Sequence, residues 1–123
     1  MTTDAPPSRT IPLPAGLRLT THRPERGTAV VAAVGDVDAH TAPRLRELLE
    51  NRASSALDHL VIDLSEVDFM TSAGLAAVEH GYLRATGRGI ACTVRVGPGS
   101  RLLRVARLFP LRFLDAVADH PHG

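Results

Sequence analysis

The feature that most constrains the fold is a strand-like apolar run followed closely by a helix-like pattern. Residues 60–64 (LVIDL) form a short apolar run that is typical of a buried strand. Leu75, Val78 and Tyr82 then recur with helical spacing, which predicts a helix whose apolar stripe is buried. A buried strand that leads into a helix is the repeating unit of α/β folds, in which helices pack against a sheet.

Ser72 lies at the junction between these two segments. Serine is a favoured helix N-cap. The first turn of a helix also has unpaired backbone N–H groups and the positive end of the helix dipole. A phosphate attached to Ser72 would therefore lie close to suitable donors. Local chemistry leaves two roles open for Ser72, a structural cap and a modification site.

The segments before the junction predict a leader and two strands. Residues 1–15 contain four prolines and little hydrophobic periodicity, so we expect a flexible leader. Residues 17–21 alternate in polarity and predict a first strand that stops at Pro24. Residues 28–34 predict a central strand, which the polar stretch at 35–38 is expected to end.

A first helix is expected after these strands. Thr41 can cap it, and Pro43 suits its first turn because proline lacks the N–H that would be unpaired there. Its apolar stripe consists of Leu45, Leu48 and Leu49. We expect Leu45 and Leu48 to be buried between helix and sheet.

The segments after the junction predict one more strand and one more helix. The glycines of residues 86–89 suit the end of the second helix, and residues 90–96 alternate as a strand. Ser100 is expected to cap a third helix that Pro110 ends, and residues 111–118 fit either a short strand or one helical turn. The expected apolar stripe of the third helix is Leu102, Val105, Ala106 and Phe109.

The order of these elements predicts an α/β fold with one mixed sheet of four to five strands packed with helices. A single domain is expected over residues 16–118, followed by a tail at 119–123. Arg101, Arg104 and Arg107 predict either a solvated helix face or a contact with an acidic partner.

Composition argues against several classes of function. The net charge of +1 gives no electrostatic reason to expect binding to nucleic acid or to a membrane. The single cysteine, Cys92, cannot form an internal disulfide and suits a reducing compartment. No apolar run reaches the length of a membrane span or of a signal-peptide core, so we expect a soluble cytoplasmic protein. The six histidines lack a metal-ligand spacing, so neither a metal nor a cofactor is expected.

Three short motifs resemble those of a known family. Residues 35–42 (GDVDAHTA), 63–65 (DLS) and 69–75 (FMTSAGL) occur with the order and separation found in STAS domains, and more narrowly in bacterial anti-sigma factor antagonists. The resemblance covers roughly residues 16 to 118. It implies a non-enzymatic protein that binds an anti-sigma factor, which is itself a serine kinase, and thereby frees a sigma factor. Phosphorylation releases the antagonist in that family, and a serine phosphatase resets the cycle.

The resemblance also implies site residues. Ser72 matches the phosphorylated serine, and Asp38 matches the acidic residue of a neighbouring loop. Gly74 matches a glycine that lets the helix start approach its neighbours. Thr71 stands where the family usually has aspartate, so a carboxylate is lost and a second candidate hydroxyl is gained. The full expected partner-binding set is Asp36, Asp38, His40, Thr41, Thr71, Ser72, Ala73 and Gly74.

Two alternatives remain beside this reading. The first keeps the fold but makes the chain a STAS partner subunit of a transporter or signalling assembly, without a phosphorylation cycle; the threonine at position 71 favours it. The second is a small hydrolase that uses Ser72 with His40 or His80. It lacks a nucleophile elbow, because Met70 stands where that motif has glycine.

Overall fold

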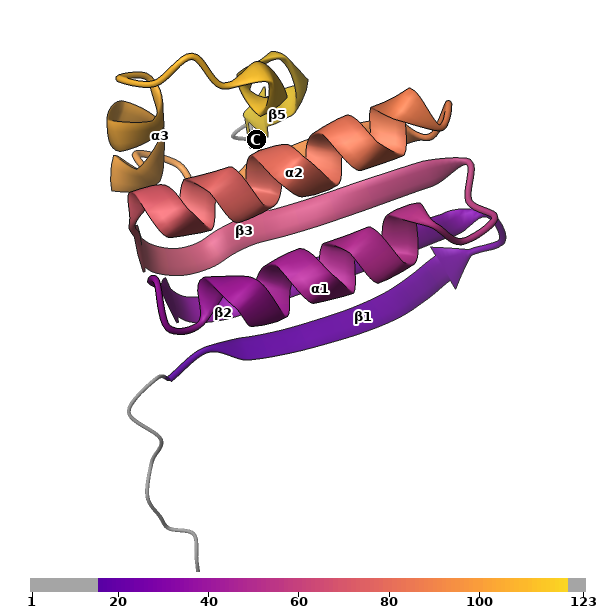
Figure 1. Cartoon of the computed structure of the whole chain (residues 1–123), viewed down its shortest axis with the longest axis horizontal. Coiled ribbons are helices and arrows are strands. Elements are labelled where there is room, and N and C mark those ends of the chain that lie inside the picture. Colours follow the sequence, from indigo (N-terminus) through magenta and orange to yellow (C-terminus); the bar gives the residue numbers. More distant parts are fainter. Residues whose placement is uncertain (1–15, 120–123) are drawn as a thin grey trace, which may run out of the picture.

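The computed structural model describes residues 16–119, which form one five-stranded sheet with two long helices on one face (Figure 1). The expected leader at 1–15 and the last four residues of the expected tail lie outside the described residues. The strands are β1 (Arg18–Glu25), β2 (Thr28–Val37), β3 (His59–Met70), β4 (Ala91–Val96) and β5 (Val117–Asp119). The helices are α1 (Ala42–Ala53), α2 (Ser72–Gly87), α3 (Arg101–Ala106) and a 3-10 helix, η3 (Arg112–Ala116).

The strands lie side by side in sequence order, with β1 antiparallel to β2 and all other neighbours parallel. This arrangement confirms the predicted α/β fold and mixed sheet. Helices α1 and α2 connect the parallel strands β2, β3 and β4, and the two helices run along the same face of the sheet (Figure 1). Within the described range, no helix is long and apolar enough to cross a membrane.

The core between helices and sheet is aliphatic. Val31, Ile62 and Val94 occupy one register line across three neighbouring strands, and all three are fully buried. Leu45 and Leu75 pack onto this layer from the two helices. Leu48 is only partly buried, contrary to expectation, because it lies at the side of the α1 stripe while Leu45 and Leu49 face the sheet.

Three strands are longer than the sequence predicts: β3, expected at 60–64, runs from His59 to Met70, and β1 and β2 are also extended. Strand β1 continues past Pro24 to Glu25, with a register shift in that region. The missing N–H of Pro24 is tolerated because β1 is an edge strand. Strand β2 continues past Gly35, which adopts a left-handed φ of 112° at another register shift, and ends at Val37. The sequence predicts that the strand ends here, but the chain forms a β-bulge and the strand continues beyond it.

The C-terminal region also differs from the prediction. Ser100 caps α3 as expected, accepting a hydrogen bond from the backbone of Leu102 at 3.1 Å. The helix ends at Ala106, before Pro110, so Phe109 lies beyond it; contrary to expectation, Phe109 and Val105 are both exposed. Residues 111–118 contain both of the alternatives left open, η3 and then β5, and Asp119 belongs to β5 and not to the tail.

Candidate functional site

The ends of strands β2 and β3 bring the expected site residues to one edge of the sheet. The two strands are parallel, and Val37 at the end of β2 pairs with Met70 at the end of β3. The backbone N–H of Thr71 donates to the Val37 carbonyl at 2.9 Å. The loop that follows β2 and the start of α2 therefore lie side by side. In α/β sheets, the carboxyl ends of parallel strands are the usual location of binding sites.

Ser72 is exposed on the first turn of α2. The structure corrects its expected position by one residue: Thr71 is the N-cap and Ser72 is the first helical residue. The first intrahelical hydrogen bond runs from the Leu75 N–H to the Thr71 carbonyl at 3.0 Å. The preceding N–H groups of the first turn have no helical acceptor. A phosphate on the Ser72 hydroxyl would meet these donors and the positive end of a 16-residue helix.

Thr71 has a different environment from Ser72. Its side chain is half-buried, and its hydroxyl makes a long hydrogen bond of 3.5 Å to the Val37 carbonyl and caps no amide of α2. The hydroxyl of Thr71 thus faces β2, whereas Ser72 faces solvent. Of the two candidate acceptors, Ser72 is the more accessible to another protein.

Gly74 lets α2 begin close to β2. It is buried, and a Cβ atom at this position would lie 2.5 Å from Met70 Cγ and 2.8 Å from Val37 Cγ1. Such distances are well inside van der Waals contact, so any side chain here would push the start of α2 outward. The position of Ser72 beside the end of β2 depends on this glycine.

Asp38 and Thr41 fix the shape of the neighbouring loop. One carboxylate oxygen of Asp38 accepts hydrogen bonds from the N–H groups of His40 at 2.9 Å and Thr41 at 3.0 Å. These bonds, foremost that from Thr41, hold the pKa of Asp38 below its usual value, although partial burial acts in the opposite direction. Thr41 is the N-cap residue of α1, as expected, but its buried hydroxyl bonds no amide of the helix and instead accepts from the Asp38 N–H at 3.0 Å.

The other expected site residues belong to the same two segments. Asp36 and His40 are exposed near the end of β2, and Ala73 is half-buried on α2 next to Ser72. The edge therefore presents two acidic side chains and one unbonded serine hydroxyl, beside a helix N-terminus.

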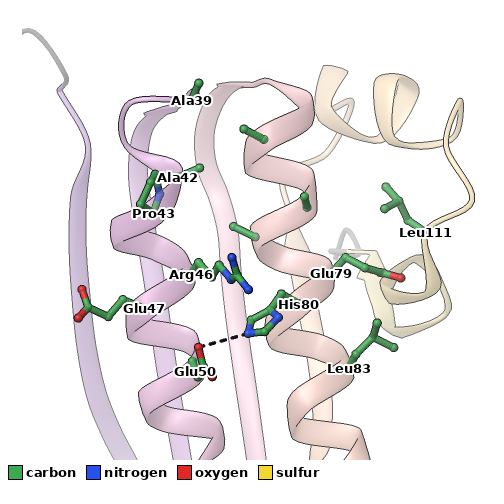
Figure 2. A pocket seen from close by; sticks show the side chains of 13 residues that line it. Ala39, Ala42, Pro43, Arg46, Glu47, Glu50, Glu79, His80, Leu83 and Leu111 are labelled. Carbon is green, nitrogen blue, oxygen red and sulfur yellow. Dashed lines mark ion pairs between the residues drawn. The ribbon is translucent and has the colours of Figure 1, made fainter.

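A groove between α1 and α2 adjoins this edge, and the sequence did not reveal it (Figure 2). Its volume is about 920 Å³. Ala39 and Ala73, the residue next to Ser72, line one end of the groove, and Ala76 and Ala77 line it further along α2. Alanines on the facing sides of two neighbouring helices were the available signal, because such small side chains leave a gap between helices.

An ion-pair cluster joins the two helices across the groove (Figure 2). Glu50 of α1 lies 3.4 Å from His80 Nε2, the contact drawn in Figure 2, and 3.7 Å from Arg84 Nη2; both partners belong to α2. The Glu50–His80 contact does not have hydrogen-bond geometry, and it is an ion pair only when the imidazole is protonated. Since His80 is eight residues from Ser72, the two lie about 12 Å apart along the helix axis. His80 is therefore not placed to act as a base for Ser72.

The remaining reactive groups do not add a second site. Burial raises the pKa of the Cys92 thiol to about 12, so this thiol stays protonated and is a poor nucleophile. Across residues 16–119, no three histidine, cysteine or acidic side chains gather in a way that could hold a metal ion.

Comparison with known proteins finds a matching family model and solved structures with a similar fold. A family model described as "Mlab, STAS domain" matches residues 21–112. An anti-sigma factor antagonist from Mycobacterium paratuberculosis is 29% identical, with a TM-score of 0.65 over 85% of this chain and 93% of that one. The Bacillus cell fate determinant SpoIIAA in its phosphorylated form is 15% identical, with a TM-score of 0.66 over 85% and 93%. The murine anion transporter Slc26a9 is 13% identical, with a TM-score of 0.64 over 78% of this chain but only 17% of the transporter.

Proposed function

We propose that this chain, which belongs to the STAS domain family, acts by binding another protein. In this proposal it serves as an anti-sigma factor antagonist. Its partner would be an anti-sigma factor with serine kinase activity in the cytoplasm, and phosphorylation of Ser72 would release that partner. The observation that carries the proposal is the exposed Ser72 hydroxyl on the first turn of α2, beside the loop of Asp38. The similarity to an antagonist from Mycobacterium paratuberculosis supports it.

Electrostatics explains how phosphorylation of Ser72 would act. A phosphate adds about −1.5 to −2 charges at neutral pH. The start of α2 accommodates this charge, so the fold changes little. In an interface centred on Ser72, however, a phosphate beside Asp36 and Asp38 is an uncompensated charge, and burying it costs several kcal/mol. A loss of about 4 kcal/mol corresponds to roughly a thousandfold weaker binding.

The groove between α1 and α2 extends the proposed contact surface. Its near end, at Ala39 and Ala73, adjoins Ser72, so a partner seated on Ser72 would also cover these alanines. Ala76 is exposed in the groove. Ala76→Arg would place a long cation there without disturbing the core, and we expect it to weaken partner binding while the protein stays folded.

A second candidate function is supported by Thr71. The resemblance to antagonists implies aspartate at this position, and the threonine hydroxyl instead faces the Val37 carbonyl. A STAS subunit that docks in a transporter assembly needs no carboxylate beside the serine and no phosphorylation. The shared fold with part of an anion transporter is compatible with this role.

The experiment that separates these functions starts with affinity capture from the native cytosol and mass spectrometry of the bound proteins. Recovery of a small ATP-binding kinase, and its transfer of one phosphate to Ser72 mapped by peptide sequencing, are the expected results. Ser72→Ala should abolish the modification and keep binding, and Thr71→Val is the matched control that should still be modified. Modification that persists in Ser72→Ala contradicts the assignment of Ser72. Recovery of transporter subunits without any phosphate transfer favours the second candidate.

A further inference from the structure

A cluster of large apolar side chains is exposed around α3, away from the groove between α1 and α2. Phe69, near the end of β3, is 56% exposed, Val105 of α3 is 41% exposed, and Leu108 in the following turn is 78% exposed. Phe69 and Val105 line the same pocket. Adjacent exposed apolar side chains of this size commonly mark an interaction surface.

Three arginines lie on the same segment as Val105 and Leu108, and Arg101 lines the pocket together with Phe69 and Val105. Arg101, Arg104 and Arg107 recur every third residue along and just beyond α3, and all three are exposed. Among the described residues, none of them forms an ion pair within 4.0 Å, whereas Arg84 and Arg95 do. The charge of this surface is therefore available to a partner. The α3 surface, as we call it, comprises Phe69, Val105, Leu108, Arg101, Arg104 and Arg107.

A small pocket gives the α3 surface a specific shape. It has a volume of about 280 Å³ and lies between the end of β3 and α3. Phe69, Met70 and Val105 supply apolar walls, and Asp68 and Arg101 supply one charge of each sign. A pocket with apolar walls and a cation suits one large apolar side chain that is flanked by a carboxylate.

We propose that the α3 surface binds an acidic amphipathic segment of another protein, which inserts an apolar side chain beside Phe69 and pairs its carboxylates with the three arginines. A second copy of this chain fits poorly, because a self-complementary contact would bring the arginines of both copies together. A lipid surface fits less well than a protein segment, because three cations are fewer than polybasic lipid-binding segments use. The proposal goes beyond the Ser72 switch and does not depend on it.

Selection from a phage-displayed library of random 12-residue peptides against the intact protein tests this proposal. We expect enriched peptides to combine a large apolar residue with aspartate or glutamate. They should bind the triple variant Arg101→Gln, Arg104→Gln, Arg107→Gln, and the variant Phe69→Ser, at least tenfold more weakly. The matched control is Arg18→Gln, Arg23→Gln, Arg26→Gln, which removes the same charge from exposed positions in or next to β1 and should bind as the unmodified protein does. Circular dichroism checks that each variant is folded.

Three results would overturn the proposal: enrichment of neutral or basic peptides only, no enrichment at all, or equal binding by both triple variants. Co-sedimentation with vesicles of phosphatidylglycerol and phosphatidylcholine tests the lipid alternative. If only the α3 triple variant loses this co-sedimentation, and acidic peptides are not enriched, the surface binds lipid. Ser72→Ala, which removes the proposed phosphorylation site without adding a charge near Met70, should bind the selected peptides normally. Failure of the α3 proposal is therefore separable from failure of the proposed Ser72 switch.

Discussion

Asp38 has a structural role in its loop and a proposed role in partner contact, and a single substitution would change both. Its carboxylate holds the loop before α1 through the N–H groups of His40 and Thr41. The same side chain lies at the edge where we propose that a partner binds. Loss of binding in Asp38→Ala would therefore not by itself identify a contact residue. Ala39 is exposed in the same loop and its side chain makes no hydrogen bond, so Ala39→Arg is a better probe of the contact.

The hydrogen bonds of Asp38 predict a pH dependence of stability. Because its pKa is lowered in the folded state from the usual 3.8, the ionised carboxylate stabilises the fold above that value. This contribution is lost as the pH falls from 3.8 through the lower pKa of the folded state. Urea unfolding at about pH 7 and about pH 3 should show a smaller loss of stability on acidification for Asp38→Asn than for the unmodified protein. Equal losses would contradict the role of the carboxylate.

Gly74 provides a prediction on packing. Gly74→Ala should destabilise the fold by about 1–3 kcal/mol, because the new methyl group would overlap Met70 and Val37. Gly87→Ala is the matched control, since it lies in the same helix and a Cβ there meets nothing within 4 Å. That control should be neutral, or stabilising by up to about 1 kcal/mol. Chemical denaturation measures both, and equal effects of the two substitutions would show that the close approach of α2 to β2 does not matter.

At the scale of elements, hydrophobic patterns predict most helices and strands but not their ends. The apolar runs at 28–34 and 60–64 identify β2 and β3, yet both strands continue through polar residues to Val37 and Met70. Pairing with a neighbouring strand, which a local pattern cannot show, sustains these extensions. The residues expected at the site lie close together because they belong to two short motifs at the ends of β2 and β3. The groove was missed because it depends on how α1 and α2 pack.

A contact between distant elements, equally invisible in the sequence, holds the C-terminal segment in place. Both carboxylate oxygens of Glu79 on α2 accept the Arg112 N–H at 2.9 Å, and one accepts the Phe113 N–H at 3.0 Å. These bonds secure the start of η3, where Phe113 enters the core with no exposed surface. The hydrogen-bonded pairs are 33 and 34 residues apart, so Glu79 looks like any surface acid in the sequence.

Glu79→Ala should therefore destabilise the protein by about 1–3 kcal/mol, since it leaves two backbone donors without an acceptor. Hydrogen exchange at the amides of Arg112 and Phe113 should become faster, while exchange within α1 should change only as much as the overall stability does. Glu47→Ala, which removes an exposed acid from α1, is the control and should have little effect. Unchanged exchange at both amides would contradict the anchoring role of Glu79.

At the scale of the whole molecule, the proposed switch is separate from the parts that provide stability. The core lies between the sheet and the two long helices, whereas Ser72 and the loop of Asp38 lie at the edge formed by the ends of β2 and β3 (Figure 1). A charge added at this edge contacts solvent and helix N–H groups, and it does not enter the core. The molecule can therefore change its affinity for a partner without unfolding, which is what a reversible switch requires.

This separation predicts opposite effects of one charge on stability and on binding. Ser72→Asp should keep or slightly raise the melting temperature, because a carboxylate in the first turn of a helix stabilises it by about 0.3–1 kcal/mol. The same variant should bind the kinase partner more weakly, since it places a charge in the interface. Ala56→Asp adds the same charge in the exposed loop between α1 and β3, at the opposite edge of the sheet, and should leave the affinity unchanged.

Thermal unfolding and titration calorimetry on the same samples measure both effects, and the protein phosphorylated at Ser72 completes the series. Its affinity should fall further than that of Ser72→Asp, because phosphate carries about −1.5 to −2 charges where aspartate carries one. A melting temperature that falls together with the affinity would mean that the added charge acts by unfolding α2. Equal affinities of the phosphorylated and unmodified proteins for the partner would show that Ser72 does not lie in the interface.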